Sequence, residues 1–310
     1  MINGKKDFID LSHYQKNELI TILNTALDLK RKSNTAFKPL AGKTLGMIFA
    51  KSSTRTRVSF EAGMQKLGGK GIFLSQNDLQ LGRGEPLKDT AMVLERYLDA
   101  LMIRTYKHKE VVEMARYSTI PVINGLTDFN HPCQVMADLL TIYEKKGKFN
   151  ALKMAYCGDG NNIANSLAVG AAKIGLNLHI ATPLNYECNP EIIKAVQNST
   201  VTFSNDPRAA CEKADIIYTD VWISMGQEQQ RRQKLHDFTG FQINNQLVEK
   251  AADDYIFMHC LPAHRGEEVS AAVIDSSHSV IYDQAENRMH AQNAILYLLL
   301  SDNINIKSEI

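Results

Sequence analysis

The 310 residues of this chain are enough for two domains of ordinary size, and 44% of them are apolar, as is usual for a globular protein. The 35 basic and 34 acidic residues leave a net charge of +1, so no overall field attracts nucleic acid or an anionic membrane surface. Any anion site must therefore be local.

Neither a targeting signal nor a disulfide pattern can be recognised in the sequence, which indicates a reducing, intracellular setting. No apolar run is long enough to span a bilayer, and residues 1–15 lack the apolar core of a secretory signal. The five cysteines are scattered and form no CxxC pair, which argues against a disulfide framework or a zinc ribbon. We expect a cytoplasmic protein whose cysteines are mostly reduced core thiols.

The first half of the chain alternates short apolar runs with helical patterns. An amphipathic helix is predicted over residues 12–31, and a long helix over residues 134–145 ends at the polar stretch 145–150, where we place the linker. Alternation of this kind is typical of parallel strands joined by crossover helices. The expected strands of this half are residues 44–50, 71–75, 101–105 and 120–125.

The second half starts the alternation again, so a second parallel sheet is expected. A largely apolar last helix, residues 286–301, is expected to cross back onto the first domain. The predicted fold is α/β with two domains, each a parallel sheet flanked by helices: residues 1–146 with about 286–310, and residues 147–285. The expected strands of the second half lie within residues 152–158, 176–182, 201–204, 215–220 and 255–262.

Loops that follow parallel strands collect ligands, and the first such loop here is rich in hydroxyl and guanidinium groups. A strand that feeds this loop into a helix start gathers free backbone amides, the positive end of the helix dipole and planar cationic groups, which together favour a phosphate. The alternative is an ordinary capped helix start with solvated charges. The residues concerned are Ser53, Thr54, Arg55, Thr56, Arg57 and Ser59.

Two further features of the first half suit the same ligand. His131, Pro132, Cys133 and Gln134 open the helix after the fourth strand, where proline fits a first helical turn. Histidine can then donate to a carbonyl oxygen and glutamine can accept from an NH2 group, which suits a carbamoyl or amide; a surface histidine beside an N-terminal proline is the alternative. Arg104 ends an otherwise apolar strand, where an unpaired cation is costly, so we expect it to face an anion.

In the second half, Gly158 and Gly160 form a turn between a strand and a helix, but the spacing of a dinucleotide fingerprint fails. We instead expect the asparagines at this turn to bind the polar end of a small second substrate. These asparagines are Asn161, Asn162 and Asn165.

A polar loop follows Asp220, which ends another strand of the second half. The loop contains Trp222, Ser224 and Met225 and extends to residue 237. Such a loop can close over bound ligand and exclude water, and a solvated surface loop is the alternative.

The last strand end carries His259, Cys260 and His264. We expect no metal here, because only one or two ligands can converge from a strand end without partners elsewhere. Cys260 is open to two interpretations, an acyl-accepting nucleophile or a positioning group, since no neighbouring residue establishes the base that a nucleophile needs. Arg288 is the remaining cation expected to face the ligand, with a surface salt bridge as its alternative.

Four segments, in their order and separations, resemble the aspartate/ornithine carbamoyltransferase family: KSSTRTRVSFE, HPCQVMADLLT, DVWISMGQE and MHCLPAHRGEEV. The resemblance covers nearly the whole chain. The first two segments are shared across the family, whereas the SMG loop and HCLP are similar to its ornithine branch. Neither HPLPR nor the basic substrate loop of the aspartate branch is present.

By this resemblance, the first domain would bind carbamoyl phosphate and the second would bind ornithine. Gln80 would lie in a loop that reaches the site of a neighbouring subunit in a homotrimer, and Cys260, Leu261 and Arg288 would lie where the amine meets the carbamoyl carbon. The implied carbamoyl phosphate set is Ser53, Thr54, Arg55, Thr56, Gln80, Arg104, His131, Pro132, Cys133, Gln134, Cys260, Leu261 and Arg288, and the implied ornithine set is Asn162, Asp220, Ser224 and Met225.

The implied reaction is attack of the deprotonated δ-amine of ornithine on carbamoyl phosphate, giving citrulline and phosphate for arginine metabolism, with no metal or organic cofactor. Thr56, Arg104 and His131 would donate to the growing oxyanion, Gln134 would hold the carbamoyl NH2 group and Arg55 would neutralise the leaving phosphate. Two alternatives stay open, a transferase acting on putrescine or another amine and a non-catalytic carbamoyl phosphate-binding protein. No nucleic acid or membrane partner is expected.

Overall fold

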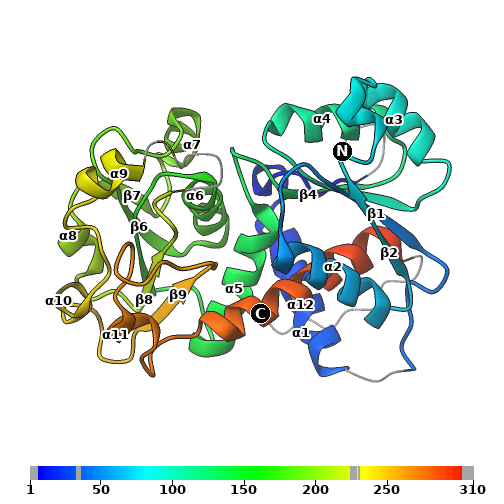
Figure 1. The fold of residues 1–310 in the computed structure, drawn as a ribbon. Coiled ribbons are helices and arrows are strands. Elements are labelled where there is room, and N and C mark those ends of the chain that lie inside the picture. The colour runs from blue at the N-terminus through cyan, green and yellow to red at the C-terminus, as the bar shows by residue number, and fades with distance from the viewer. Residues whose placement is uncertain (1–5, 33–35, 224–228, 230, 302–310) are drawn as a thin grey trace. The chain divides into compact units, whose positions relative to one another are not determined.

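Two compact units make up the chain (Figure 1). The computed structural model describes residues 6–32, 36–223, 229 and 231–301. One unit comprises Met1–Leu140 and Asn287–Ile310, and the other comprises Thr141–Glu286. Both boundaries fall inside long helices, α5 (Pro132–Lys146) and α12 (Ile281–Leu300), whereas the sequence placed the linker in the polar stretch that follows the first of these helices.

The first unit is built on a four-stranded parallel sheet in the order β2-β1-β3-β4. Phe49 pairs with both Ser75 and Arg104, so three neighbouring strands end at the same level. The strands are β1 (Thr44–Phe49), β2 (Lys70–Ser75), β3 (Ala100–Arg104) and β4 (Val122–Leu126), and the helices are η1 (Leu11–His13), α1 (Lys16–Arg31), α2 (Thr54–Lys66), η2 (Gln80–Arg83), α3 (Leu87–Leu94) and α4 (His108–Tyr117).

Helix α2 begins at Thr54, inside the segment that the sequence presented as a loop before a helix. The reason is a cap, because Ser53 Oγ accepts a hydrogen bond from the Thr56 N–H at 3.2 Å. The segment rich in hydroxyl and guanidinium groups is therefore the first turn of a helix rather than a loop before one.

The C-terminal part of α12 lies beside α1 and α2 (Figure 1). Lys30, in the last turn of α1, donates to Asn287 Oδ1 at 2.8 Å. Gly63 of α2 permits a close approach, since a Cβ atom there would lie 2.1 Å from Asn293 Oδ1. The last helix packs on the first domain, which confirms this part of the predicted fold. Helix α1 begins at Lys16, later than predicted, because a capping box closes its N-terminus there.

The second unit is built on a five-stranded parallel sheet in the order β7-β6-β5-β8-β9. Every predicted strand of this half is present, and the α/β fold class is confirmed. The strands are β5 (Lys153–Cys157), β6 (Asn177–Ala181), β7 (Val201–Ser204), β8 (Ile216–Thr219) and β9 (Ile256–His259), and the described helices are α6 (Asn162–Ile174), α7 (Pro190–Val196), α8 (Pro207–Cys211), α9 (Arg231–Asp237), α10 (Asn245–Val248) and α11 (Ala271–Ile274).

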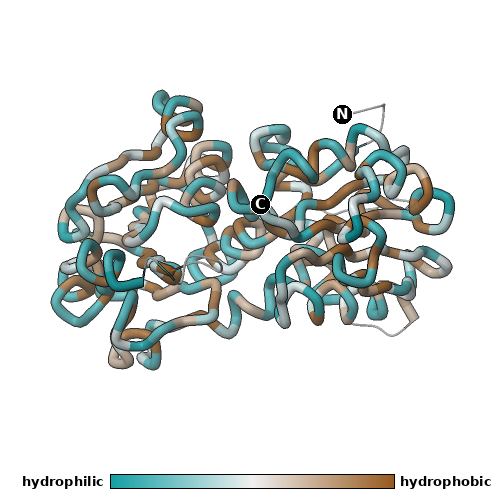
Figure 2. The backbone as a smooth tube through the Cα atoms, turned by 45° about the horizontal axis from the view of Figure 1, so that its top comes forward, coloured by the Kyte–Doolittle hydropathy of each residue, from teal (hydrophilic) through white to brown (hydrophobic). Residues whose placement is uncertain are grey.

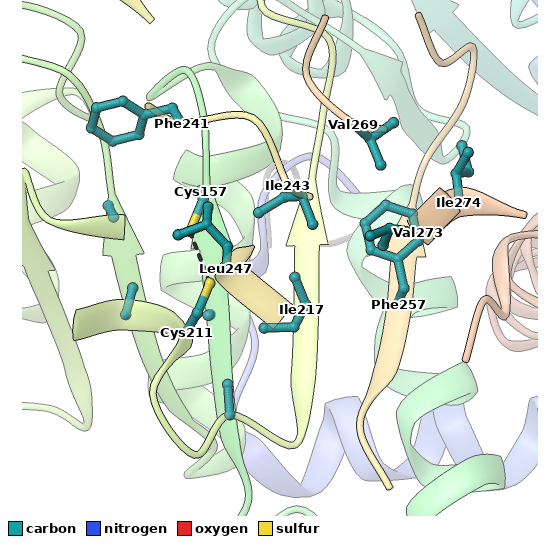
Figure 3. Close-up of a cluster of buried hydrophobic side chains, with 14 of the residues drawn as sticks. Cys157, Cys211, Ile217, Phe241, Ile243, Leu247, Phe257, Val269, Val273 and Ile274 are labelled. Carbon is teal, nitrogen blue, oxygen red and sulfur yellow. Dashed lines mark hydrogen bonds between the residues drawn. The ribbon is translucent and has the colours of Figure 1, made fainter. Parts of the chain in front are cut away.

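A cluster of buried apolar side chains covers one face of this second sheet. Ile217 and Phe257 point from β8 and β9 into it, and the thiols of Cys157 and Cys211 lie 3.7 Å apart within it (Figure 3). All five cysteines of the chain are free. In the first unit, a similar cluster includes Ile48.

Each sheet has a point at which successive crossovers leave in opposite directions. In the first sheet, β2 and β3 lie on opposite sides of β1, and in the second sheet, β6 and β8 lie on opposite sides of β5. Open parallel sheets bind ligands beyond the carboxyl ends of the strands at such points. Two of the polar segments singled out in the sequence, residues 53–59 and 158–165, follow these central strands, β1 and β5.

Along the helices, hydrophilic and hydrophobic residues alternate, as expected for helices with one buried face (Figure 2). Among the helices that the structure describes, none combines the length and the apolar character needed to cross a membrane.

Candidate active site

The start of helix α2 is both a capped helix end and a collection point for hydroxyl and guanidinium groups. Ser53 forms the cap, Thr54 is exposed in the first turn and Arg55 is half-buried. Beside this turn lies a hollow of about 600 Å³, whose lining includes Lys51 and Ser52. The free amides and dipole of the helix start make this hollow favourable for an anion.

Two residues of the predicted anion cage have partners within helix α2 itself. Arg57 pairs with Glu61 one turn along the helix at 3.0 Å and lies over the ring of Phe73, with 3.8 Å between the guanidinium carbon and the ring centroid. Ser59 Oγ donates to the carbonyl of Thr56 at 3.2 Å. Arg57 also lines the hollow beside the helix start, so its place in the anion cage stays a prediction.

Two buried arginines converge on one threonine in the first unit. Arg104, at the end of β3, donates from Nη1 to Thr56 Oγ1 at 3.5 Å, and Arg288, in α12, donates from Nη2 to the same oxygen at 2.7 Å. All three residues are buried. Arg288 therefore does not form the surface salt bridge that was its alternative.

His131 precedes helix α5 and is buried near both arginines. Burial first, then the charges of Arg288 and Arg104, hold the pKa of His131 well below its ordinary value of 6.5. Its imidazole is therefore neutral at physiological pH, and one ring nitrogen carries a proton that can be donated. The alternative of a surface histidine is excluded by its 3% exposure.

Gln134 has one end of its amide fixed and the other end open. Its Nε2 donates to Asp138 Oδ1 at 2.8 Å, whereas its buried Oε1 has no hydrogen-bond partner among the described residues. Cys133 is directed elsewhere, because its thiol donates to the carbonyl of Asn124 at 3.4 Å. Burial raises the pKa of Cys133 to about 12, so it is a neutral core thiol.

Gln80 is exposed at the start of η2, and Pro132 opens α5. Among the described residues, no hydrogen bond or ion pair links the Gln80 side chain to Thr56 or to the two arginines. The structure of one chain therefore does not join Gln80 to the cluster of Thr56, Arg104, His131, Gln134 and Arg288, which we call the first-unit cluster.

In the second unit, Asp220 follows β8 and is held from three sides. It accepts from Asn161 Nδ2 at 2.8 Å, from the Val221 N–H at 2.8 Å and from the Cys260 thiol at 3.0 Å. Asn161 also caps helix α6, whereas Asn162 is the first helical residue. We call Asn161, Asp220 and Cys260 the second-unit cluster; the sequence grouped Asn162, rather than Asn161, with Asp220.

Sequence reasoning did not single out Lys234, because it predicted either a solvated polar stretch or a loop that closes over bound ligand in this region. Its side chain is 3% exposed, and its ammonium donates to Asp159 Oδ2 at 2.6 Å and to the carbonyl of Trp222 at 2.9 Å. Burial raises the pKa of Asp159, and the ammonium opposes that rise. Lys234 thus ties helix α9 to the residues before the SMG loop. Ser224 and Met225 of that loop lie outside the described residues.

The strand end at β9 is held by a buried hydrogen-bond chain. His259 Nε2 lies 3.2 Å from Glu268 Oε1, and His259 Nδ1 accepts from the Leu261 N–H at 2.9 Å. Ligand atoms of Asp220, His259 and Cys260 lie within 4.8 Å of one another. The sequence argument counted only the possible metal ligands of this strand end. It did not include Asp220, which follows β8 and lies close to Cys260.

The two halves of the chain match the two domain models of one family. Residues 6–144 match the model described as aspartate/ornithine carbamoyltransferase, carbamoyl-P binding domain, and residues 150–299 match the Asp/Orn binding domain. The chain belongs to the aspartate/ornithine carbamoyltransferase family.

Relatives within the aspartate/ornithine carbamoyltransferase family cover almost the whole chain. The ornithine carbamoyltransferase of Anoxybacillus flavithermus is 53% identical, with 95% of this chain and 96% of the relative covered. That of Thermococcus kodakarensis is 52% identical at the same coverage. The solved structure of ornithine carbamoyltransferase from Pyrococcus furiosus matches with a TM-score of 0.92 at 50% identity, covering 98% of this chain and 100% of that one.

This carbamoyltransferase carries one more buried cation that sequence reasoning passed over. Lys51 lies directly before the hydroxyl segment, pairs with Asp128 and lies over the ring of Tyr106 with 4.1 Å to the centroid. A lysine next to a predicted anion site was the available signal. The sequence signal for the burial of Lys234 was weaker. It consists only of the four-residue spacing between Lys234 and Phe238, which puts the two side chains on the same side of the helical turn.

Proposed function

We propose that this carbamoyltransferase transfers the carbamoyl group of carbamoyl phosphate to the δ-amine of L-ornithine, giving L-citrulline and phosphate. The observation that carries the proposal is the convergence of Arg104 and Arg288 on Thr56 Oγ1, near a neutral His131. The identity of 50% or more to proteins named ornithine carbamoyltransferase supports ornithine as the amine.

The carbonyl oxygen of carbamoyl phosphate gains negative charge as the amine attacks, so donors around it lower the barrier. Thr56 Oγ1 accepts from two guanidinium groups, which leaves its own hydroxyl proton free to donate. Arg104 and His131 supply further donors. The C–N bond then forms, and the C–O bond to phosphate breaks with its electron pair leaving on phosphate.

Gln134 orients the carbamoyl group. Because Nε2 is engaged by Asp138, the open Oε1 is an acceptor, and the carbamoyl NH2 group is a donor of matching geometry. A plain carboxylate or acyl phosphate lacks this donor. Gln134 therefore favours a carbamoyl group over an acetyl group of similar size.

The leaving phosphate is held at the start of helix α2. Ser53 and Thr54 supply hydroxyl and backbone donors, and Arg55 supplies a planar cation that contacts two phosphate oxygens. Pro132 and Cys133 shape the start of α5, with Cys133 contributing its backbone rather than its thiol.

The second unit binds ornithine. Asp220, which Asn161 and the Cys260 thiol hold in one orientation, accepts from the α-amino group. Cys260 is a positioning group, since its S–H donates to Asp220 Oδ1 and so helps to fix the orientation of that carboxylate. Asn162, Ser224 and Met225 complete the ornithine set by family resemblance, whereas Leu261 belongs to the carbamoyl phosphate set.

The active assembly is a homotrimer in the cytoplasm, in which Gln80 acts on the site of a neighbouring subunit. The exposure of Gln80 and its separation from the first-unit cluster of its own chain are consistent with this role. Size-exclusion chromatography with light scattering measures the subunit number directly.

The test is citrulline formation by the purified protein with ornithine, alongside carbamoylation of putrescine at the same concentrations. We expect ornithine to be used with the higher kcat/KM, and Arg55→Lys to lose on the order of 10²-fold or more, because a point charge cannot contact two oxygens at once. Arg96→Lys, at an exposed arginine of the same unit that pairs with its neighbour Glu95, is the matched control and keeps near-normal activity. No product with either amine, or an equal loss in both variants, contradicts the proposal.

A further inference from the structure

A tight turn after β9 brings together an imidazole and two carboxylates that the proposed reaction does not use. His264 Nδ1 lies 3.9 Å from Glu268 Oε2, and one ligand atom each of His264, Glu267 and Glu268 lies within 4.8 Å of the other two. We propose that this turn binds one divalent transition-metal cation such as Zn²⁺ through His264 Nδ1 and a carboxylate oxygen of each glutamate, with water completing the coordination shell.

Two buried carboxylate oxygens at this turn have no hydrogen-bond donor among the described residues. The Glu268 side chain is fully buried; its Oε1 accepts from the His264 N–H and lies 3.2 Å from His259 Nε2, whereas its Oε2 has no hydrogen-bond partner among the described residues. Glu267 pairs through Oε1 with Arg231, and its buried Oε2 also lacks a partner among the described residues. A buried oxygen without a donor is costly, and a bound cation removes that cost.

The turn is held in place before any ligand binds. The Glu267 N–H donates to the His264 carbonyl at 2.9 Å, and the Ile243 N–H donates to the Glu268 carbonyl at 2.9 Å. Gly266 supplies the φ of +91° that the chain needs between the ligand residues. A preformed arrangement lowers the entropy lost on binding.

The donor set selects the class of cation. One imidazole and two carboxylates, with no thiolate, suit Zn²⁺, Co²⁺ or Mn²⁺ rather than a soft ion. Arg265 does not compete, because it is drawn away by Asp275 with a distance of 2.6 Å between Nη2 and Oδ1. The two glutamates carry two negative charges, and Arg231 neutralises one of them, so the remaining local charge favours a cation.

A cation at this turn stiffens the strand end that carries the second-unit cluster. Glu268 holds His259, and His259 accepts from the Leu261 N–H directly after Cys260. The Cys260 thiol lies at the same strand end and can bind a thiophilic ion by itself, so the experiment removes it.

The test is calorimetric titration of Cys260→Ser protein with Zn²⁺ alone, and in parallel with Co²⁺ followed by its visible absorption. We expect one site per chain, and at least about a tenfold weaker affinity in the added variants His264→Gln and Glu267→Gln. Both residues retain solvent exposure, so these variants should fold. His236→Gln, an exposed histidine beside a single carboxylate, is the matched control and leaves affinity unchanged.

The thermal midpoint provides a readout that does not depend on activity. Zn²⁺ should raise the midpoint of Cys260→Ser protein and leave that of Cys260→Ser/Glu267→Gln protein where it is. Absence of Zn²⁺ and Co²⁺ binding by Cys260→Ser protein overturns the proposal. So does an affinity that neither turn variant changes, or one that falls with His236→Gln.

Discussion

Arg288 Nη2 donates a hydrogen bond to Thr56 Oγ1 at 2.7 Å, although the two residues are 232 positions apart in the chain. The same oxygen accepts from Arg104. Three segments of the first unit therefore meet at the Thr56 hydroxyl group. This hydroxyl accepts a hydrogen bond from each of the two guanidinium groups.

Thr56→Val removes this hydroxyl while keeping the shape of the side chain. We expect kcat/KM for carbamoyl phosphate to fall by about 10²- to 10³-fold, because one donor to the oxyanion is lost and both guanidinium groups lose an acceptor. Thr56→Ser should retain most of the activity. Steady-state kinetics at saturating ornithine measure the effect, with Ser59→Ala as a control whose hydroxyl bonds only within the helix. Equal kinetics for Thr56→Val and Thr56→Ser would refute the role.

The buried neutral His131 makes stability depend on pH. The unfolded chain binds a proton at His131 below about pH 6.5, whereas the folded chain does so only at a much lower pH. The free energy of unfolding should therefore fall as pH drops below 6.5, by up to about 1.4 kcal/mol per unit, and show no contribution from His131 above it.

Urea unfolding of wild type and His131→Gln at several pH values isolates this contribution, because the difference between the two slopes belongs to His131. We expect the variant to have the flatter pH dependence between pH 6.5 and 5. Parallel curves would show that His131 titrates normally in the folded protein.

The buried Lys234–Asp159 ion pair predicts a charge-dependent stability loss. Lys234→Met leaves Asp159 buried without its cation, which should lower the free energy of unfolding by about 3–5 kcal/mol. Adding Asp159→Asn should recover part of the loss, because no unpaired charge remains. Urea denaturation measures both, and Lys250→Met, at an exposed position of the same unit, should stay within about 0.5 kcal/mol of wild type. A double variant as unstable as the single one would count against the pair.

Asn161→Asp separates helix capping from substrate binding. A carboxylate caps α6 as well as an amide does, so any loss of stability comes from the lost hydrogen bond to Asp220 and the like charge beside it rather than from the cap. The variant loses the donor to Asp220 and faces it with a like charge, so KM for ornithine should rise at least about tenfold while KM for carbamoyl phosphate stays constant. An unchanged KM for ornithine would remove Asn161 from the site.

The sequence predicted the strands well because an apolar run bounded by turn residues is a local signal. Strand β1 and the hydroxyl segment that follows it are adjacent in the chain. The sequence could therefore predict that the end of this strand leads directly into the start of a helix. The pairing of Arg57 with Glu61 could not be foreseen, since it depends on where the helix begins, and that is set by the Ser53 cap.

The sequence by itself determined the α/β class, the two parallel sheets and the types of side chain that carry the chemistry, because these follow from periodicity and from short segments. Only the tertiary structure decided which side chains meet. It paired Arg288 with Thr56, Asn161 with Asp220 and Lys234 with Asp159. The physical reason is that a buried polar group must find its partner wherever packing brings one, and that partner lies tens to hundreds of residues away in the chain.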